Sequence, residues 1–239
     1  MLSFLKNHPF PVEAFFDRSL VLTFAAPKEA LEGLIPPCLT LDTFEDRWGF
    51  IALAMVQTSG LRPKGFHRFF GSDFFLIGYR VFTRFTTEQG KRLRGLYILR
   101  SETDKKRMLF LGNLFTHYRY TITDIRQEEG IVRSQGSGLS VETTEGETLP
   151  EGSPFHDWKD ARRFAGPLPF TFTYLPKQRK VLIVEGVREN WTPRPVTVKK
   201  FSVPFIDGLQ IGGLRLAGAF AVENIPYHWK KGRVERWKP

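Results

Sequence analysis

The fold is decided by Phe74–Phe85, which reads FFLIGYRVFTRF. Bulky apolar residues fill this run and are joined in its second half by Arg80 and Thr83, a pattern typical of a half-buried β-strand. Similar runs recur on both sides at roughly even spacing, and turn-forming residues such as Glu88–Gly90 separate them. This repetition predicts a sheet of antiparallel strands built outward from Phe74–Phe85.

Strand-like runs account for most of the chain. Two short strands are expected after the turns at 128–130 and 136–138. The longer runs are Arg18–Phe24, Trp48–Thr58, Leu93–Arg100, Met108–Ile125 and residues 169–174, 180–190, 195–201, 218–225 and 233–237.

Helices are expected to be few and short. Proline suits the first turn of a helix, which predicts one helix after Pro27, over Lys28–Ile35, and another after Ser153 and Pro154. Residues 1–17 are predicted to form an irregular N-terminal arm with one possible helical turn. No repeat divides the chain, so we predict a single domain over 1–239. It should be mainly β with a few short helices, forming a large, closed or nearly closed antiparallel β cone or barrel.

Composition limits the classes of protein. With 239 residues, 41% of them hydrophobic, the chain can bury a sizeable core, which excludes a disordered chain. The 35 Lys and Arg against 25 Asp and Glu give a net charge of +10. Cys38 is the single cysteine, which excludes an intramolecular disulfide and a cysteine-based zinc site.

Motifs of common cofactor sites are missing from the sequence. There is no glycine-rich phosphate loop, GxSxG elbow or HExxH, and the five histidines are scattered. We therefore expect no cofactor and no metal. Charged residues interrupt the N-terminal apolar residues before a signal peptide can form, and no segment approaches the roughly 20 apolar residues that span a bilayer. These features predict a cytoplasmic protein that does not enter a membrane.

A family resemblance begins at Glu32–Gly65, which reads EGLIPPCLTLDTFEDRWGFIALAMVQTSGLRPKG. This stretch resembles the opening of the YqjF-like uncharacterised family (DUF2071), a branch of the acetoacetate decarboxylase-like superfamily. The resemblance continues through FFLIGYRVFTRF, GLYILRSETD and FTHYRYTITDI, is traceable in NWTPRPVTVKK and PYHWKKGRVERW, and covers about Arg18 to Trp237. It implies a cone-like, largely closed β-sheet around a small polar cavity.

The resemblance also implies a site, which this sequence matches in part. Decarboxylases of the superfamily use a lysine that forms a Schiff base, an arginine for the substrate carboxylate, and supporting glutamates. Arg18 falls at the position of the arginine, whereas the lysine stretch falls near Thr116–Tyr118, where no lysine stands, and one glutamate position reads as Ile51. Elsewhere, one of Lys199–Lys200 is a candidate functional amine, with solvated surface charge as the alternative. The family's decarboxylation through an imine is therefore not expected.

The segment Leu114–Thr123, LFTHYRYTIT, supplies the candidate catalytic residue. Strand geometry puts His117 and Arg119 on one face and Tyr118 and Tyr120 on the other. If the first face lines the cavity, His117 titrates near neutral pH beside a fixed cation, which suits acid–base catalysis with Arg119 binding the substrate. The alternatives are that this face meets solvent, or that His117 is a buried histidine with satisfied hydrogen bonds.

Further candidates for binding an anionic ligand are Arg18, Arg80 and Gln57. Arg18 shares the parity of the apolar residues that follow it, so it points inward if they do, or else reaches water at the strand end. An inward arginine in a water-poor cavity needs a carboxylate from the protein or from a ligand. The same argument applies with less force to Arg80, and Gln57 either lines the cavity or belongs to a turn. Glu185 or Glu189 is the candidate internal carboxylate, with surface exposure as the simpler account.

These residues favour a small-molecule binding protein or enzyme with a polar, cation-lined cavity suited to a carboxylate or similar oxyanion. If it is an enzyme, acid–base chemistry on a small carboxylate, lyase-like by the resemblance, is expected. The alternatives are a basic protein that binds polyanions such as nucleic acid, and a non-catalytic oligomeric scaffold. Lys and Arg are spread along the chain among acidic residues, so no specific nucleic-acid partner is predicted. A homo-oligomer is compatible with the sequence.

Overall fold

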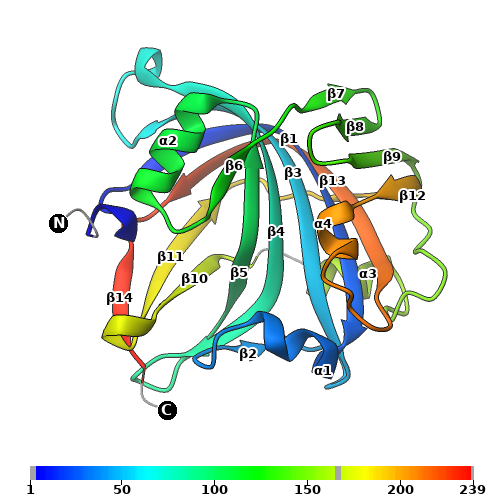
Figure 1. Ribbon diagram of the computed structural model, residues 1–239. Helices are drawn as coiled ribbons and strands as arrows, with labels where there is room; N and C mark the ends of the chain where they lie inside the picture. The colour runs from blue at the N-terminus through cyan, green and yellow to red at the C-terminus, as the bar shows by residue number, and fades with distance from the viewer. Residues whose placement is uncertain (1–3, 165–167, 238–239) are drawn as a thin grey trace.

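The computed structural model describes residues 4–164 and 168–237 and is mainly β, as the sequence predicts (Figure 1). The strands are β1 (Val12–Pro27), β2 (Thr40–Leu41), β3 (Trp48–Pro63), β4 (Ser72–Thr86), β5 (Arg92–Thr103), β6 (Tyr120–Ile122), β7 (Arg126–Glu128), β8 (Ile131–Ser134), β9 (Leu139–Glu145), β10 (Phe170–Leu175), β11 (Lys180–Arg188), β12 (Arg194–Ser202), β13 (Arg215–Trp229) and β14 (Arg233–Arg236). The α-helices are α1 (Lys28–Leu31), α2 (Lys106–Phe115), α3 (Trp158–Phe164) and α4 (Pro204–Asp207), and the 3-10 turns are η1 (Leu5–Asn7), η2 (Glu32–Leu34), η3 (Arg68–Phe70) and η4 (Pro176–Gln178). Among the described helices, none has the length and apolar character needed to cross a membrane.

Seven strands form a closed ring. Their hydrogen-bonded order is β11–β10–β5–β4–β3–β1–β13, and β13 pairs back onto β11. A ring with an odd number of strands cannot be antiparallel throughout. The parallel contact is the one between β10 and β5, which a long connection separates in the chain. The predicted closed, mainly antiparallel sheet is therefore confirmed as a ring of seven strands with one parallel contact.

A second layer lies against the outside of the ring. Beyond β13 the sheet continues through β12, β9, β8 and β7, and α4 packs beside them (Figure 1). The apolar core between the layers includes Leu20, Leu22 and Ile77 from the ring. Because side chains alternate along a strand, Ser19 of β1 faces the inside of the ring instead. Arg18 has the parity of Leu20, so the inward direction considered for it is wrong.

Helices close the ring at its two ends. At one end, Phe164 of α3 packs with Phe50 of β3 and Phe82 of β4, and Asp157 caps this predicted helix by accepting the Asp160 N–H at 2.7 Å. Near the start of β4, α2 packs on the opposite end of the inner face. The middle of β4 therefore faces the space that remains between the two helices.

The long strand predicted over Met108–Ile125 is wrong. Residues Lys106–Phe115 form α2, and β6 covers only Tyr120–Ile122. An unbroken apolar run such as MLFLGNLF does not distinguish a strand from a buried helix, and its Leu, Met and Phe residues are not β-branched. The predicted arm also ends early, because β1 begins at Val12.

Candidate functional site

A cavity of about 130 Å³ lies inside the ring, between the two end helices. All seven ring strands contribute to its wall, mostly with alanine, valine, leucine and aromatic side chains. Its polar lining is small and consists of Ser19, Arg80, Ser101, Thr171 and Arg188, the phenols of Tyr118, Tyr120 and Tyr227, and the indole of Trp191. The fold thus places a few polar groups in a largely apolar enclosure, as ligand-binding cavities do.

Arg80 reaches the cavity from the middle of β4. Strand alternation turns Gly78, Arg80 and Phe82 to the inside, while Tyr79 and Val81 belong to the outer core. The Arg80 guanidinium lies against Gly78: a Cβ at that position would be 2.9 Å from both Nε and Nη2. Glycine at 78 therefore leaves the space that the guanidinium occupies.

Arg188 reaches the same cavity from the end of β11. The chain repeats the pattern of β4 here, because Gly186 precedes Arg188 by two residues and a Cβ at 186 would overlap the Tyr227 hydroxyl. The Arg188 guanidinium carbon lies 4.6 Å from the centre of the Trp191 ring, and Nη2 donates a hydrogen bond of 3.3 Å to the Leu168 carbonyl. Aromatic stacking and this hydrogen bond fix the orientation of Arg188.

Four buried polar atoms of the cavity wall have no hydrogen-bond partner among the residues that the structure describes. They are Nε of Arg80, Nε of Arg188, Nε1 of Trp191 and Oη of Tyr118. Each of them carries a hydrogen that can be donated. Native proteins pair nearly all buried polar groups, since an unpaired one costs about 1–3 kcal/mol. Four unpaired donors around one small space therefore call for an acceptor from outside the chain.

The charge of the cavity is positive. Within the described part of the chain, its lining contains the two arginines and no Asp, Glu, Lys or His. Burial lowers the pKa of the Arg80 guanidinium, and the like charge of Arg188 lowers it further, but arginine starts so high that it stays protonated near neutral pH. Burial raises the pKa of the Tyr118 phenol, so Tyr118 stays neutral and can donate. The Thr171 hydroxyl lies beside it without hydrogen-bond geometry.

The other residues predicted for the site lie outside this cavity. Arg18 Nε is 3.7 Å from Glu223 Oε1, and Gln57, its partner in the β1–β3 register, is exposed. His117 and Arg119 line a separate polar crevice between the 116–119 loop and strands β5 and β10. Arg80 is therefore the one predicted residue that the structure places in the cavity.

The crevice has an electrostatic character of its own. His117 Nε2 lies 3.3 Å from Asn7 Oδ1, and Lys6 also lines the crevice. Burial lowers the pKa of His117, and the positive charge of Lys6 lowers it further. The imidazole is therefore neutral near pH 7, which removes one of the two charges expected for a His117–Arg119 anion site.

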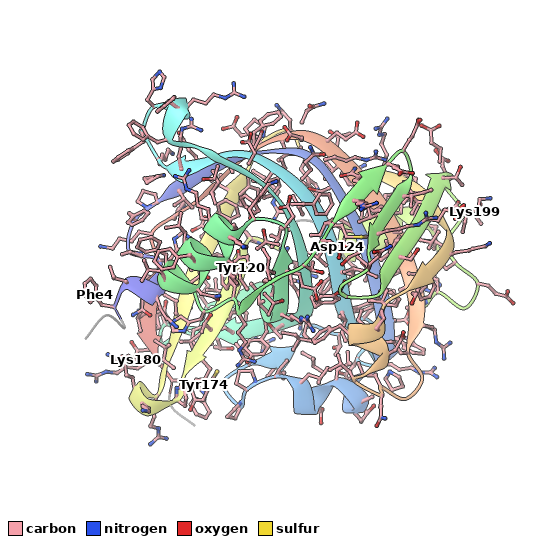
Figure 2. The ribbon with its side chains drawn as sticks, turned by 45° about the horizontal axis from the view of Figure 1, so that its top comes forward. Phe4, Tyr120, Asp124, Tyr174, Lys180 and Lys199 are labelled. Carbon is pink, nitrogen blue, oxygen red and sulfur yellow. The ribbon has the colours of Figure 1, made fainter. Side chains whose placement is uncertain are left out.

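The candidate internal carboxylates are on the surface. Glu185 Oε1 accepts a hydrogen bond of 2.8 Å from Lys230 Nζ, and Glu189 is exposed. Lys199 is also exposed and lies at the edge of the molecule, far from Tyr120 beside α2 (Figure 2). In the region where the resemblance would place a lysine, Tyr118 enters the cavity instead.

Sequence reasoning missed Arg188, Trp191 and Tyr118. A signal was present for the first of these, because Gly78-Tyr79-Arg80 and Gly186-Val187-Arg188 repeat a Gly-x-Arg step inside apolar strands. Tyr118 was placed on the face opposite His117, and the structure agrees with that separation although the segment is a loop. Across residues 4–164 and 168–237, no three His, Cys, Asp or Glu side chains gather in a way that could hold a metal ion.

The closed ring of strands is similar to the fold of acetoacetate decarboxylase-like proteins. Similar solved structures include acetoacetate decarboxylase from Legionella pneumophila, with 11% identity, a TM-score of 0.63, and coverage of 95% of this chain and 87% of that one. The enduracididine biosynthesis enzyme MppR, complexed with pyruvate, gives 10% identity, a TM-score of 0.59, and coverage of 95% and 90%. An acetoacetate decarboxylase-like enzyme from Sphingomonas wittichii RW1 has 13% identity and a TM-score of 0.56, with coverage of 98% of this chain and 94% of that one.

At such identities the likeness concerns the fold. The family is given by the sequence itself: the model of the DUF2071 family, described as uncharacterized conserved proteins, matches residues 14–214. The chain belongs to this family, as its resemblance indicated. Among curated proteins, none matches the sequence.

Proposed function

We propose that the protein binds a small carboxylate, or a similar oxyanion, in the cavity inside the ring. The observation that carries this proposal is the set of four unpaired donors, on Arg80, Arg188, Trp191 and Tyr118, with no carboxylate of the described chain near them. A carboxylate offers two oxygens and a negative charge, which match guanidinium donors in geometry and in sign.

The energetics favour a ligand in this role. Two like charges held in a poorly solvated space cost free energy, and an anion between them offsets that cost. Gly78 and Gly186 leave room for the Arg80 guanidinium and for Tyr227, which stacks on Arg188. Donors held in place before a ligand arrives lose little entropy when it binds.

If the protein transforms its ligand, acid–base chemistry is the class that fits. Tyr118 is a neutral phenol with an unpaired hydroxyl in the cavity, so it can donate a hydrogen bond or a proton to a bound carboxylate or its neighbouring atoms. No lysine lines the described cavity, so imine formation is not part of the proposal. His117, in its separate crevice, is not part of this site.

The comparisons support a carboxylate of this kind. One neighbour in fold is named for acetoacetate and another is complexed with pyruvate, and both compounds are small keto acids. Because those proteins share only the fold with this chain, the arginine pair carries the proposal and the neighbours suggest which probes to use first.

The test is binding of small monocarboxylates and keto acids, with acetate, butanoate, pyruvate and acetoacetate as probes and the matching amides as uncharged controls. A probe at about 100 times its Kd should stabilise the protein by about 2.7 kcal/mol, which a thermal melt detects. We expect at least one acid to bind, the amides not to bind, and Arg80→Gln to weaken binding at least tenfold. Arg18→Gln, a matched arginine outside the cavity, should leave affinity unchanged. Equal binding by the parent and Arg80→Gln would refute the proposal.

A further inference from the structure

An apolar groove of about 400 Å³ lies next to the cavity, where α2 covers the end of the ring. Its walls come from α2, from the arm that precedes β1, and from the segment that joins β3 to β4. Leu111 and Phe115 of α2 line it on one side, and Phe66 and Phe70 line it on another. Most of the lining is aliphatic or aromatic, with Arg62 and Arg107 as its charged members.

The groove and the cavity share a wall. Five side chains line both spaces: Phe16, Leu76, Tyr118, Tyr120 and Trp229. The unpaired Tyr118 hydroxyl belongs to this shared wall. The two spaces are therefore adjacent, and an apolar chain that extends from a charged end at Arg80 toward these shared side chains points to the groove.

The size of the two spaces points in the same direction. Pockets for small molecules usually measure about 300–1,000 Å³, and the cavity alone is well below that range. The cavity together with the groove falls within it. The polar end of the combined space is cationic and its larger part is apolar, which is the distribution found in an amphiphilic acid.

Two exposed aromatic side chains line the outer part of the groove. Phe66 is 58% exposed and Phe70 is 57% exposed, and their rings meet edge to face at 6.4 Å between centroids. Exposed aromatic side chains that gather at a pocket mark a binding surface for apolar matter.

We infer that the ligand is a monocarboxylic acid with an extended apolar chain, whose carboxylate binds Arg80 and Arg188 while its chain passes Tyr118 and Tyr120 into the groove. This inference rests on the proposed function, because it assumes the carboxylate site. It adds a substrate class: medium-chain alkyl or aryl-alkyl acids in place of acids as small as pyruvate.

The experiment is calorimetric titration with straight-chain acids from acetate to decanoate, kept below their micelle concentrations, and with the matching primary alcohols. Each buried methylene contributes about 0.8 kcal/mol, so affinity for the acids should rise about fourfold per methylene until the groove is full. The alcohols should bind at least tenfold more weakly than acids of equal length. Arg80→Gln should remove that difference.

Two variants separate the groove from the cavity. Phe66→Ala/Phe70→Ala removes two partly exposed groove side chains, so it should fold normally and lower octanoate affinity several-fold while leaving acetate affinity unchanged. Phe69→Ala is the matched control, because Phe69 lies in the same segment, is 85% exposed, and does not line the groove.

The outcomes are distinct. Arg80-dependent binding that rises with chain length and falls in the double variant supports the inference. Arg80-dependent binding that is flat with chain length overturns the inference and keeps the proposed function. Equal binding of acids and alcohols, insensitive to Arg80→Gln, overturns both, as does no binding of any acid. A dimer that only the double variant dissociates would show that a second copy covers the groove and would also overturn the inference.

Discussion

Arg80 and Arg84 lie four residues apart on the same face of β4, yet one has a carboxylate partner and the other has none. Arg84 Nε donates to Asp42 Oδ1 at 2.5 Å, and Arg94, across from it on β5, donates to Oδ2 at 2.7 Å. Asp42 is fully buried beneath the two guanidinium groups. Arg80 lines the same cavity as Arg188, and the described part of the chain contributes no carboxylate to that cavity.

The difference teaches how to separate a structural arginine from a binding one. The Asp42 cluster is complete within the protein: a buried carboxylate has a donor on each oxygen, and each arginine keeps about 40% of its side chain in water. The Arg80–Arg188 pair is incomplete, because it has donors and charge without an acceptor. Arg80 and Arg84 share residue type, strand and face, so the presence or absence of a carboxylate decides which of them is available to a ligand.

The largest expected effect comes from breaking the complete cluster. Asp42→Asn removes the negative charge that Arg84 and Arg94 share, and it should lower the free energy of unfolding by about 2–4 kcal/mol. This is somewhat less than the loss expected from breaking a fully buried ion pair, because both arginines can turn to water. In a chain of this length the loss from Asp42→Asn corresponds to a fall in Tm of about 4–16 °C. Urea titration and thermal melts measure it.

The control for this change is Asp46→Asn. Asp46 is 87% exposed and pairs with Lys28 at 3.0 Å, so its loss should change stability by less than about 0.5 kcal/mol. Equal effects of the two substitutions would show that the Asp42 cluster contributes no more than a surface pair.

The second effect has the opposite sign. Arg80→Met replaces a half-buried charge that has no carboxylate partner in the described chain with an apolar side chain of similar length, so it should raise the free energy of unfolding by about 1–3 kcal/mol while abolishing carboxylate binding. Arg84→Met, on the same strand and face, should instead lower stability by about 1–2 kcal/mol, because Asp42 then keeps a single partner. Thermal melts without ligand compare the two variants. A loss of stability in both would mean that Arg80 is structural.

Much of the ring, but not the helix that covers its end, could be predicted from the sequence alone. The ring, its long strands β1, β3 and β4, and the helix after Ser153 follow from apolar periodicity and turn residues, which are local properties. Helix α2 was missed because its run is apolar on all sides in the sequence, and only its packing over the ring decides its conformation. Local pattern therefore predicted the ring better than the segment that covers it.

Locating the candidate site required knowing which side chains point into the ring, and periodicity does not determine this. Alternation separates two faces of a strand but does not say which face is inside when both are apolar. Both faces of β1 are buried here, one against the outer layer and one toward the cavity, so periodicity left the direction of Arg18 open. Arg188 comes from a strand about 100 residues after β4, and only closure of the ring brings it to Arg80.

A smaller effect is expected from a methyl group. Gly78→Ala puts a Cβ where the Arg80 guanidinium lies, so the guanidinium must shift and carboxylate affinity should fall about tenfold with little change in fold. Gly33→Ala is the control, because a Cβ there meets no atom within 4 Å. Calorimetry with the best-binding acid compares them. An unchanged affinity in Gly78→Ala would show that the position of Arg80 does not matter for binding.

The smallest expected effect is a flat pH profile, and it separates the arginine pair from the His117 crevice. Arg80 stays charged and Tyr118 stays neutral from pH 5.5 to 8.5, the latter because burial raises its pKa, so affinity for an ionised carboxylate should vary by less than about twofold. The pKa of His117 is lowered, so this residue is charged only in acid. A carboxylate held by His117 would therefore bind most tightly at pH 5.5 and lose affinity as the pH rises through that pKa. Titrations at several pH values and constant ionic strength distinguish the two sites: an affinity that falls steeply as the pH rises would move the site to the crevice and leave Arg80 and Arg188 without a demonstrated ligand.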